Sequence, residues 1–94
     1  MGNVLVSVIM PTYERDKEVI ERAINSIINQ TYLNWELIIV DDNKINEISK
    51  NIQSMIAEIN DNRIVYVKNE KNIGSAKSRN NGIKKSKGEY ITFL

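Results

Sequence analysis

Two short apolar runs, each ended by polar residues, constrain the fold of this chain more than any other feature. Val4–Met10 reads VLVSVIM and is bounded by Pro11, and Glu36–Val40 reads ELIIV and is followed by Asp41 and Asp42. Nearly continuous runs of apolar and β-branched residues are typical of strands buried on both faces of a parallel sheet. Both runs are therefore predicted to be central strands that helices cover.

Amphipathic patterns follow each of these predicted strands. Apolar residues recur at helical spacing from Val19 to Ile28, with Asp16 placed as the N-cap, and we expect this helix to end near Gln30. A second stripe of isoleucine and methionine extends over 45–59. Each stripe predicts a helix that buries one face against the sheet.

The rest of the chain continues the alternation. Arg63–Lys68 (RIVYVK) predicts a third strand near an edge, Ser75–Lys87 a third helix closed by Gly88, and Glu89–Leu94 (EYITFL) a fourth strand. Strands that alternate with helices over short connections predict a parallel sheet with right-handed crossovers. The expected fold class is α/β: a Rossmann-like, parallel four-stranded sheet in the order 3-2-1-4 with three helices, forming one partial domain over residues 1–94.

Small residues recur every four positions along the third predicted helix, at Gly74, Ser78, Gly82 and Ser86. A glycine inside a helix costs about 1 kcal/mol relative to alanine. Close packing of this helix on the sheet is therefore favoured over direct contact with a ligand.

Composition limits the chemistry that this chain can perform. Cysteine and histidine are both absent, which removes thiol nucleophiles, disulfides, zinc clusters and imidazole bases. No apolar stretch approaches the roughly 18 residues of a membrane span, so we expect a cytoplasmic protein, or one at the cytoplasmic face of a membrane as part of a longer protein. The run from Lys71 to Gly88 has six basic residues and no acidic one. It fits a phosphate-binding surface or a solvated helix face equally well, and it lacks the interleaved aromatic residues of a nucleic-acid site.

The paired carboxylates Asp41 and Asp42 have three interpretations: a metal pair, caps of the second helix, or recognition of a nucleotide base. Successive side chains leave an extended backbone in opposite directions, so the two converge poorly on one metal ion. One carboxylate accepting from an imino N–H, such as uracil N3–H, suits them better, and capping remains open for one of them. The strand order also places a crevice above Pro11, Thr12 and Tyr13. Neither G-x-G-x-x-G nor G-x-x-x-x-G-K-[ST] is present, which weakens dinucleotide and P-loop readings.

Three runs, in order, carry a resemblance to a known family: VSVIMPTYER, INSIINQTYLNWELIIVDDN and NIGSAKSRNNGIKKSKGEYITFL. They resemble the N-terminal half of the family 2 glycosyltransferases, which have the GT-A fold, from Val6 to Leu94. The resemblance implies that the donor nucleotide is bound by Pro11, Thr12, Tyr13, Glu14, Asp41, Asp42, Asn72 and Arg79.

The resemblance also assigns roles within that site. Tyr13 would lie beside the base, and Asp42 would read it, with Asp41 as the second choice. Arg79 would supply positive charge near the diphosphate. The sequence departs from the usual family pattern in three places: Glu14 stands where Asn is common, Ser78 where Ala is usual, and the pair Asn43-Lys44 where Gly-Ser is frequent.

The function implied by the resemblance is inverting transfer of a sugar from a nucleotide donor, expected to be a UDP-sugar, to an acceptor hydroxyl. The Mg²⁺ or Mn²⁺ of the full-length enzyme would be bound by a D-x-D motif, and both this motif and the catalytic base are expected beyond Leu94. This chain would then hold no metal or catalytic residue and would be inactive alone. The alternative is a non-catalytic interaction module that forms a homodimer through the exposed edge of its last strand. Nucleic acid is not an expected partner.

Overall fold

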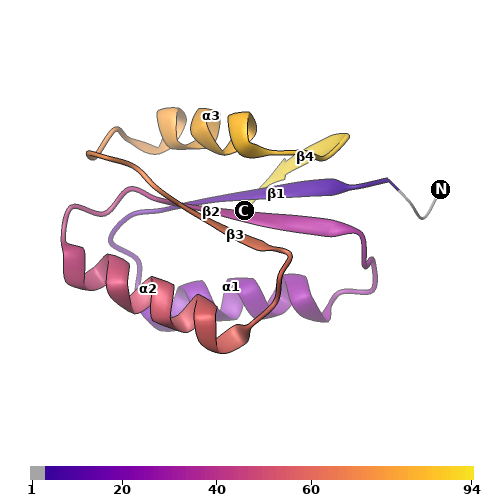
Figure 1. Ribbon diagram of the computed structural model, residues 1–94, viewed down its shortest axis with the longest axis horizontal. Coiled ribbons are helices and arrows are strands. Elements are labelled where there is room, and N and C mark those ends of the chain that lie inside the picture. Colours follow the sequence, from indigo (N-terminus) through magenta and orange to yellow (C-terminus); the bar gives the residue numbers. More distant parts are fainter. Residues whose placement is uncertain (1–3) are drawn as a thin grey trace.

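The computed structural model describes residues 4–94, so the first three residues of the predicted domain lie outside the described part. The element order is β1-α1-β2-α2-β3-α3-β4 (Figure 1). The strands are β1 (Val6–Thr12), β2 (Trp35–Asp41), β3 (Ile64–Lys68) and β4 (Tyr90–Phe93). The helices are α1 (Lys17–Asn29), α2 (Asn46–Ile59) and α3 (Ser75–Lys85).

The strands form one sheet in the order β3-β2-β1-β4, and all three pairings are parallel. This confirms the predicted fold class and strand order. The chain adds β2 and β3 on one side of β1 and then crosses to the other side to add β4. That reversal makes the carboxyl ends of β1 and β4 the topological switch point, where open α/β sheets bind ligands.

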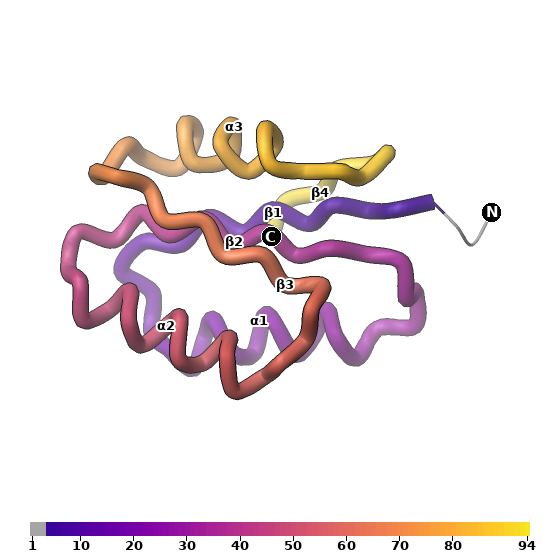
Figure 2. The backbone as a smooth tube through the Cα atoms, viewed as in Figure 1, coloured from indigo at the N-terminus to yellow at the C-terminus, as the bar shows by residue number. Residues whose placement is uncertain are grey.

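The helices divide between the two faces of the sheet. Helices α1 and α2 cover one face and α3 covers the other, as Figures 1 and 2 show. The larger buried cluster joins β1 and β2 to α1 and α2. Its fully or almost fully buried members are Val8, Met10, Ile20, Ile24, Trp35, Leu37, Ile39, Ile52 and Met55. A smaller cluster of Ile9, Ile38 and Val40 lies on the α3 face. No helix of residues 4–94 is long and apolar enough to cross a membrane.

Gly82 explains how α3 can approach that face so closely. A Cβ atom at this position would lie 2.5 Å from Cγ2 of Ile9 and 3.2 Å from Cγ2 of Val40. Both contacts are with side chains of the sheet, so the small residue lets the helix backbone pack directly on β1 and β2. At Gly82, the small-residue stripe therefore allows α3 to pack closely on the sheet, as predicted.

Strand β1 differs from its predicted bounds because it continues through Pro11 to Thr12. The backbone N–H of Asp42 donates to the carbonyl of Thr12, so even-numbered residues of β1 direct their backbone groups toward β2. Pro11 faces the other side, where pairing with β4 extends only as far as Ile9. The missing N–H of proline therefore interrupts no ladder hydrogen bond.

Candidate functional site

A cavity of about 380 Å³ lies at the switch point, between the carboxyl end of β1 and the first turns of α3. Its walls include every predicted site residue except Glu14 and Asp41. The lining residues are Pro11, Thr12, Tyr13, Arg15, Asp42, Asn72, Gly74, Ser75, Ser78, Arg79 and Leu94. Residues from four separate parts of the chain thus converge on one cavity, which we call the switch-point pocket.

The end of β1 supplies one wall of the switch-point pocket. Thr12 is buried, and its Oγ1 has no hydrogen-bond partner among the described residues. Tyr13 follows with its side chain 40% exposed, which leaves an aromatic face available to a ligand. A buried hydroxyl without a partner is costly, because it has given up its hydrogen bonds to water. A ligand that reaches Thr12 could provide the missing bond.

Asp42 forms the opposite wall and is the most heavily hydrogen-bonded group of the pocket. Its Oδ1 accepts from Nδ2 of Asn69 at 2.8 Å and from the N–H of Ile73 at 2.9 Å. Its Oδ2 accepts from Nδ2 of Asn72 at 2.7 Å and from the N–H of Gly74 at 2.9 Å. An ionised carboxylate has about four acceptor positions, so all of them are filled.

The hydrogen bonds of Asp42 stabilise its ionised form. Burial disfavours the charged form, but the bonds from Asn69 and from the Ile73 and Gly74 amides outweigh it, so the pKa of Asp42 is lowered. This carboxylate therefore holds the loop before α3, where Gly74 has a φ of +90° that favours glycine. It does not cap α2, whose N-cap is Ile45 without a side-chain bond.

Asp41 faces away from the switch-point pocket. It is fully buried, and its Oδ1 accepts from both the backbone N–H and Nδ2 of Asn43. Its Oδ2 accepts from the hydroxyl of Tyr66. Burial opposes ionisation of Asp41, yet these hydrogen bonds lower its pKa overall, and the same environment raises the pKa of Tyr66 to about 12. The two adjacent carboxylates thus point in opposite directions, as expected at the end of a strand.

Glu14 does not line the switch-point pocket either. Its side chain is exposed and borders a separate cavity of about 350 Å³ beside α1 and α2. Its backbone has a φ of +53°, and its N–H donates to Oδ1 of the buried Asn43 at 2.7 Å. The structure therefore gives Glu14 a backbone contact with the loop after β2.

Asn69 is a pocket-supporting residue that the sequence analysis missed. It is buried, and its Nδ2 donates both to Asp42 and to Oγ of Ser78 at 3.0 Å. Its Oδ1 accepts from Nδ2 of Asn81 at 2.9 Å. The available signal was its place directly after β3, since polar residues at the carboxyl ends of parallel strands face the ligand-binding edge. Ser78, which stands where Ala was expected, gains a partner in this way.

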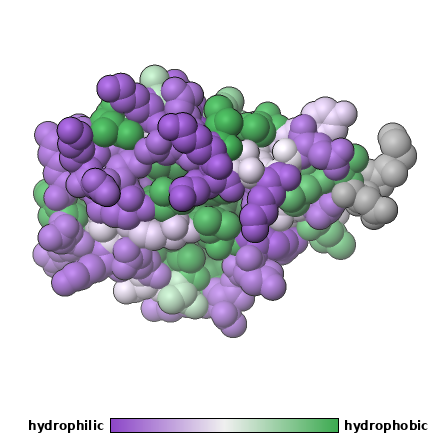
Figure 3. Space-filling view, turned by 45° about the horizontal axis from the view of Figure 1, so that its top comes forward, coloured by the Kyte–Doolittle hydropathy of each residue, from purple (hydrophilic) through white to green (hydrophobic). Residues whose placement is uncertain are grey.

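Positive charge reaches the switch-point pocket from two arginines, Arg15 and Arg79. The guanidinium of Arg79 lies 6.0 Å from the ring centre of Phe93. The other basic residues of the 71–88 run are exposed lysines, at positions 71, 77, 84, 85 and 87. Figure 3, in which the α3 side comes forward, shows hydrophilic residues over most of that surface. The basic run is thus a solvated face with one arginine in the pocket.

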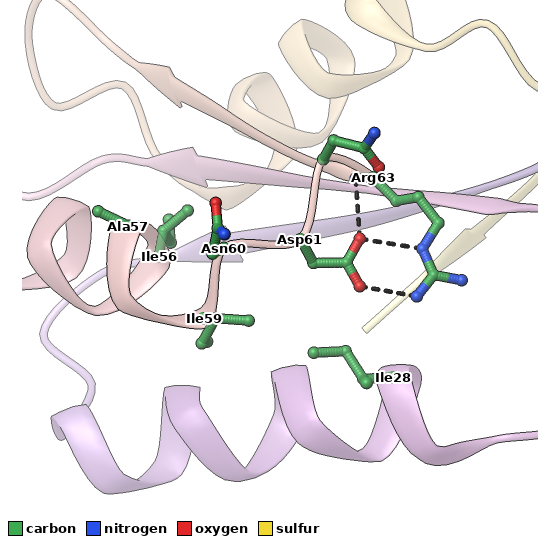
Figure 4. Close-up of a pocket in the computed structure, with 8 residues that line it drawn as sticks. Ile28, Ile56, Ala57, Ile59, Asn60, Asp61 and Arg63 are labelled. Atoms are coloured by element: carbon green, nitrogen blue, oxygen red, sulfur yellow. Dashed lines mark hydrogen bonds and ion pairs between the residues drawn. The ribbon is translucent and has the colours of Figure 1, made fainter.

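A larger cavity of about 700 Å³ lies elsewhere, at the C-terminal end of α2 beside the start of β3 (Figure 4). Isoleucines line it, and its charged groups pair with each other, since Arg63 contacts Asp61 at 2.7 Å. The guanidinium of Arg63 also stacks 3.9 Å from the Trp35 ring centre. Because the charged groups of this cavity are already paired with each other, the switch-point pocket is the better candidate site. Within residues 4–94, no group of three or more acidic residues is placed to hold a metal ion.

Comparison with known proteins gives a family match over almost the whole chain. The model of the family described as Glycosyl transferase family 2 matches residues 7–94. WcaA of Escherichia coli strain K12, whose name places it among the colanic acid biosynthesis glycosyl transferases, is 43% identical over 93 residues. The match covers 99% of this chain and 32% of WcaA.

A second relative from Escherichia coli is the UDP-Glc:alpha-D-GlcNAc-diphosphoundecaprenol beta-1,3-glucosyltransferase WfgD. It is 39% identical over 94 residues, which cover 100% of this chain and 35% of WfgD. The chain thus spans about a third of the length of the curated relatives that it matches.

Solved structures share the fold. The mannosyltransferase PcManGT of Pyrobaculum calidifontis, in complex with GDP-Man and Mn²⁺, matches with a TM-score of 0.80 at 24% identity, over 94% of this chain and 26% of its own. Residues 1–349 of S. aureus TarS match with a TM-score of 0.75 at 29% identity, over 95% of this chain and 26% of that one. These neighbours are GT-A glycosyltransferases, so the fold expected from the resemblance is confirmed.

Proposed function

Because this chain belongs to glycosyl transferase family 2, we propose that its residues bind the nucleotide of a sugar donor in the switch-point pocket. The observation that carries this proposal is the convergence of Thr12, Asp42 and Arg79 on one cavity at the carboxyl ends of the strands. Polar ligands bind in this position in open α/β sheets. A cavity that combines an exposed tyrosine, two arginines and an unpaired hydroxyl suits a base and a diphosphate together.

The base is proposed to lie against Tyr13, with its polar edge toward Asp42 and Asn72. Both N–H groups of the Asn72 amide are directed at Asp42, one to its carboxylate and one to its carbonyl. The amide oxygen of Asn72 is then the open acceptor of the pair for an imino N–H such as uracil N3–H. Asp42, whose acceptor positions are filled, would read the base through Asn72. The naming of UDP-Glc as the donor of the relative WfgD supports a UDP-sugar.

The charged part of the donor is assigned to the arginines. Arg79 extends from α3 and Arg15 from the turn after β1, so the two approach the switch-point pocket from different sides. Arginine can form paired hydrogen bonds with phosphate oxygens. We expect this pair to neutralise the diphosphate while Tyr13 fixes the base.

Replacement of Thr12 by valine tests the proposal most directly. Valine keeps the shape of threonine and removes the unpaired hydroxyl, so the fold should keep its stability or gain some. Affinity for UDP, measured by calorimetric titration, should fall on the order of fivefold because one ligand hydrogen bond is lost. GDP and CMP serve as comparison nucleotides. Unchanged UDP affinity in Thr12→Val, or no binding of any nucleotide by the wild type, would contradict the proposal.

The remaining transferase chemistry is proposed to come from outside these residues. The acceptor hydroxyl would displace the nucleotide from the sugar with inversion, and a carboxylate would act as the base. The structure of PcManGT is a complex with GDP-Man and Mn²⁺, and we propose that this enzyme too uses Mg²⁺ or Mn²⁺, with ligands outside residues 4–94. A cytoplasmic location is part of the proposal, and cell fractionation would test it.

Association through β4 is a second candidate function. All residues of β4 are exposed, including Tyr90 at 66% and Phe93 at 50%. An exposed apolar edge strand favours pairing with another strand. If this edge forms a homodimer, sedimentation at increasing concentration should show a dimer that Phe93→Lys abolishes. A strict monomer at all concentrations would exclude this function.

A further inference from the structure

The turn after β1 has an unusual backbone conformation at a position that matters for the switch-point pocket. Glu14 has a φ of +53°, a left-handed conformation that non-glycine residues adopt infrequently and glutamate less readily than asparagine. Its neighbours Tyr13 and Arg15 both line the pocket. The conformation of Glu14 therefore sets how these two residues are placed at the edge of the cavity.

One side chain from another loop holds this turn. Oδ1 of Asn43 accepts the N–H of Glu14 at 2.7 Å, and Asn43 is only 2% exposed. The contact joins residues that are 29 positions apart in the sequence, so it connects the loop after β2 to the turn after β1.

Asn43 is itself held at each of its other polar groups. Its Nδ2 and its backbone N–H donate to Oδ1 of Asp41 at 2.8 Å and 2.9 Å. Its carbonyl accepts from Nζ of Lys68, at the end of β3, at 2.6 Å. The amide oxygen is thus presented from a buried position that the ends of two strands fix, and its one recorded donor among the described residues is Glu14.

We propose that Asn43 is a positioning residue for the nucleotide, acting through the backbone of Glu14. By holding Glu14 in its left-handed conformation, Asn43 keeps Tyr13 and Arg15 directed into the switch-point pocket before the ligand arrives. This preorganisation spares the ligand the cost of ordering the turn. The proposal rests on the proposed function, since its effect is read as nucleotide affinity.

The structure offers a matched control for a purely structural role. Tyr66 donates its hydroxyl to Asp41, in the same buried network as Asn43, and it does not line the pocket. Tyr66→Phe should weaken the network while leaving the turn in place. A variant that only loosens this network should therefore lower stability without lowering UDP affinity.

The experiment compares Asn43→Ala, Tyr66→Phe and the wild type by two readouts. Hydrogen exchange at the Glu14 amide, measured without ligand, should accelerate at least tenfold in Asn43→Ala and stay slow in Tyr66→Phe. Affinity for UDP should fall on the order of fivefold in Asn43→Ala alone. If Asn43→Ala does not fold, Asn43→Ser replaces it, because its hydroxyl can donate to Asp41 but is too short for Glu14.

Rescue provides the sharpest readout. Asparagine tolerates the left-handed region better than glutamate, so adding Glu14→Asn to Asn43→Ala should restore most of the lost UDP affinity. A structural defect in the Asp41 network would not be repaired at position 14. The coupling between the two positions is obtained from the double-mutant cycle.

Three outcomes would overturn the inference: unchanged exchange and affinity in Asn43→Ala, an equal loss of affinity in Tyr66→Phe, or no rescue by Glu14→Asn. If the wild type binds no nucleotide at all, the proposed function fails first. Exchange at the Glu14 amide in the ligand-free protein still decides whether Asn43 holds the turn.

Discussion

Asp42 holds several groups of the switch-point pocket in place although it is itself almost fully buried. Its side chain ties Asn69, Asn72 and the amides before α3 into one arrangement. A carboxylate that accepts several hydrogen bonds holds its negative charge firmly, which is why its pKa lies below the usual value. The loop that carries Asn72 therefore depends on the charge of Asp42.

Acid should lower the folding stability of the protein by protonating Asp42. Because the folded-state pKa of Asp42 is below its unfolded value of 3.8, its contribution to stability is fully present above that pH. The contribution is lost as the pH falls through the folded-state pKa. Asp42→Asn should cost about 2 kcal/mol of unfolding free energy near neutral pH and make the acid dependence shallower. Urea unfolding across the acid range measures both effects.

The control for this prediction is Glu58→Gln, which removes an exposed carboxylate from α2. Its acid dependence should match that of the wild type. If the unfolding free energy of Asp42→Asn fell with acid as steeply as that of the wild type, groups other than Asp42 would dominate the acid dependence. Asp41, whose pKa is also lowered, contributes in the same direction.

Among the three helices, α3 has the weakest amphipathic pattern in its sequence. Its packing also depends most on small residues. Ser78 and Gly82 are its buried positions. A helix with so little apolar surface gains stability from close van der Waals contact rather than from large side chains. The same close approach brings Arg79 to the switch-point pocket.

Gly82→Ala should therefore destabilise the protein although alanine is the better helix former. The added methyl would overlap Ile9 on β1, and such overpacking costs about 1–3 kcal/mol. The gain from helix propensity is about 1 kcal/mol. Thermal unfolding would measure the net loss, with Asn80→Ala on the exposed side of the helix as the control. Greater stability of Gly82→Ala than of the wild type would contradict close packing.

At the scale of the whole molecule, the chain forms a sheet with its candidate site at one end and spans about a third of the length of its curated relatives. The proposed function assigns binding of the nucleotide to these residues and transfer of the sugar to residues outside them. We expect the 94-residue chain to bind UDP but to show no metal-dependent transfer from UDP-sugars. A radiolabelled-sugar assay with Mg²⁺ and Mn²⁺ would check this, and measurable transfer by the purified chain would contradict it.

Local pattern was sufficient to predict much of this fold. The apolar runs at β1 and β2 and the helical stripes indicated the elements within a few residues, because burial imposes a period on each kind of element. Their alternation then indicated the parallel order. Some observed bounds differ from the predicted ones because backbone pairing decides where a strand ends. Strand β1 continues past Pro11, although a proline considered by itself predicts the end of a strand.

By itself, the sequence determined the elements, their order and the polar strand ends that meet at the switch point. Only the tertiary structure decided which of those polar groups face the pocket. Asp42 is bound by groups 27 to 32 positions away, while Asp41 turns to Tyr66 and Glu14 contributes its backbone to Asn43. Such partners meet only after the crossovers bring distant strand ends together. The spacing of apolar residues within one segment therefore gives no information about them.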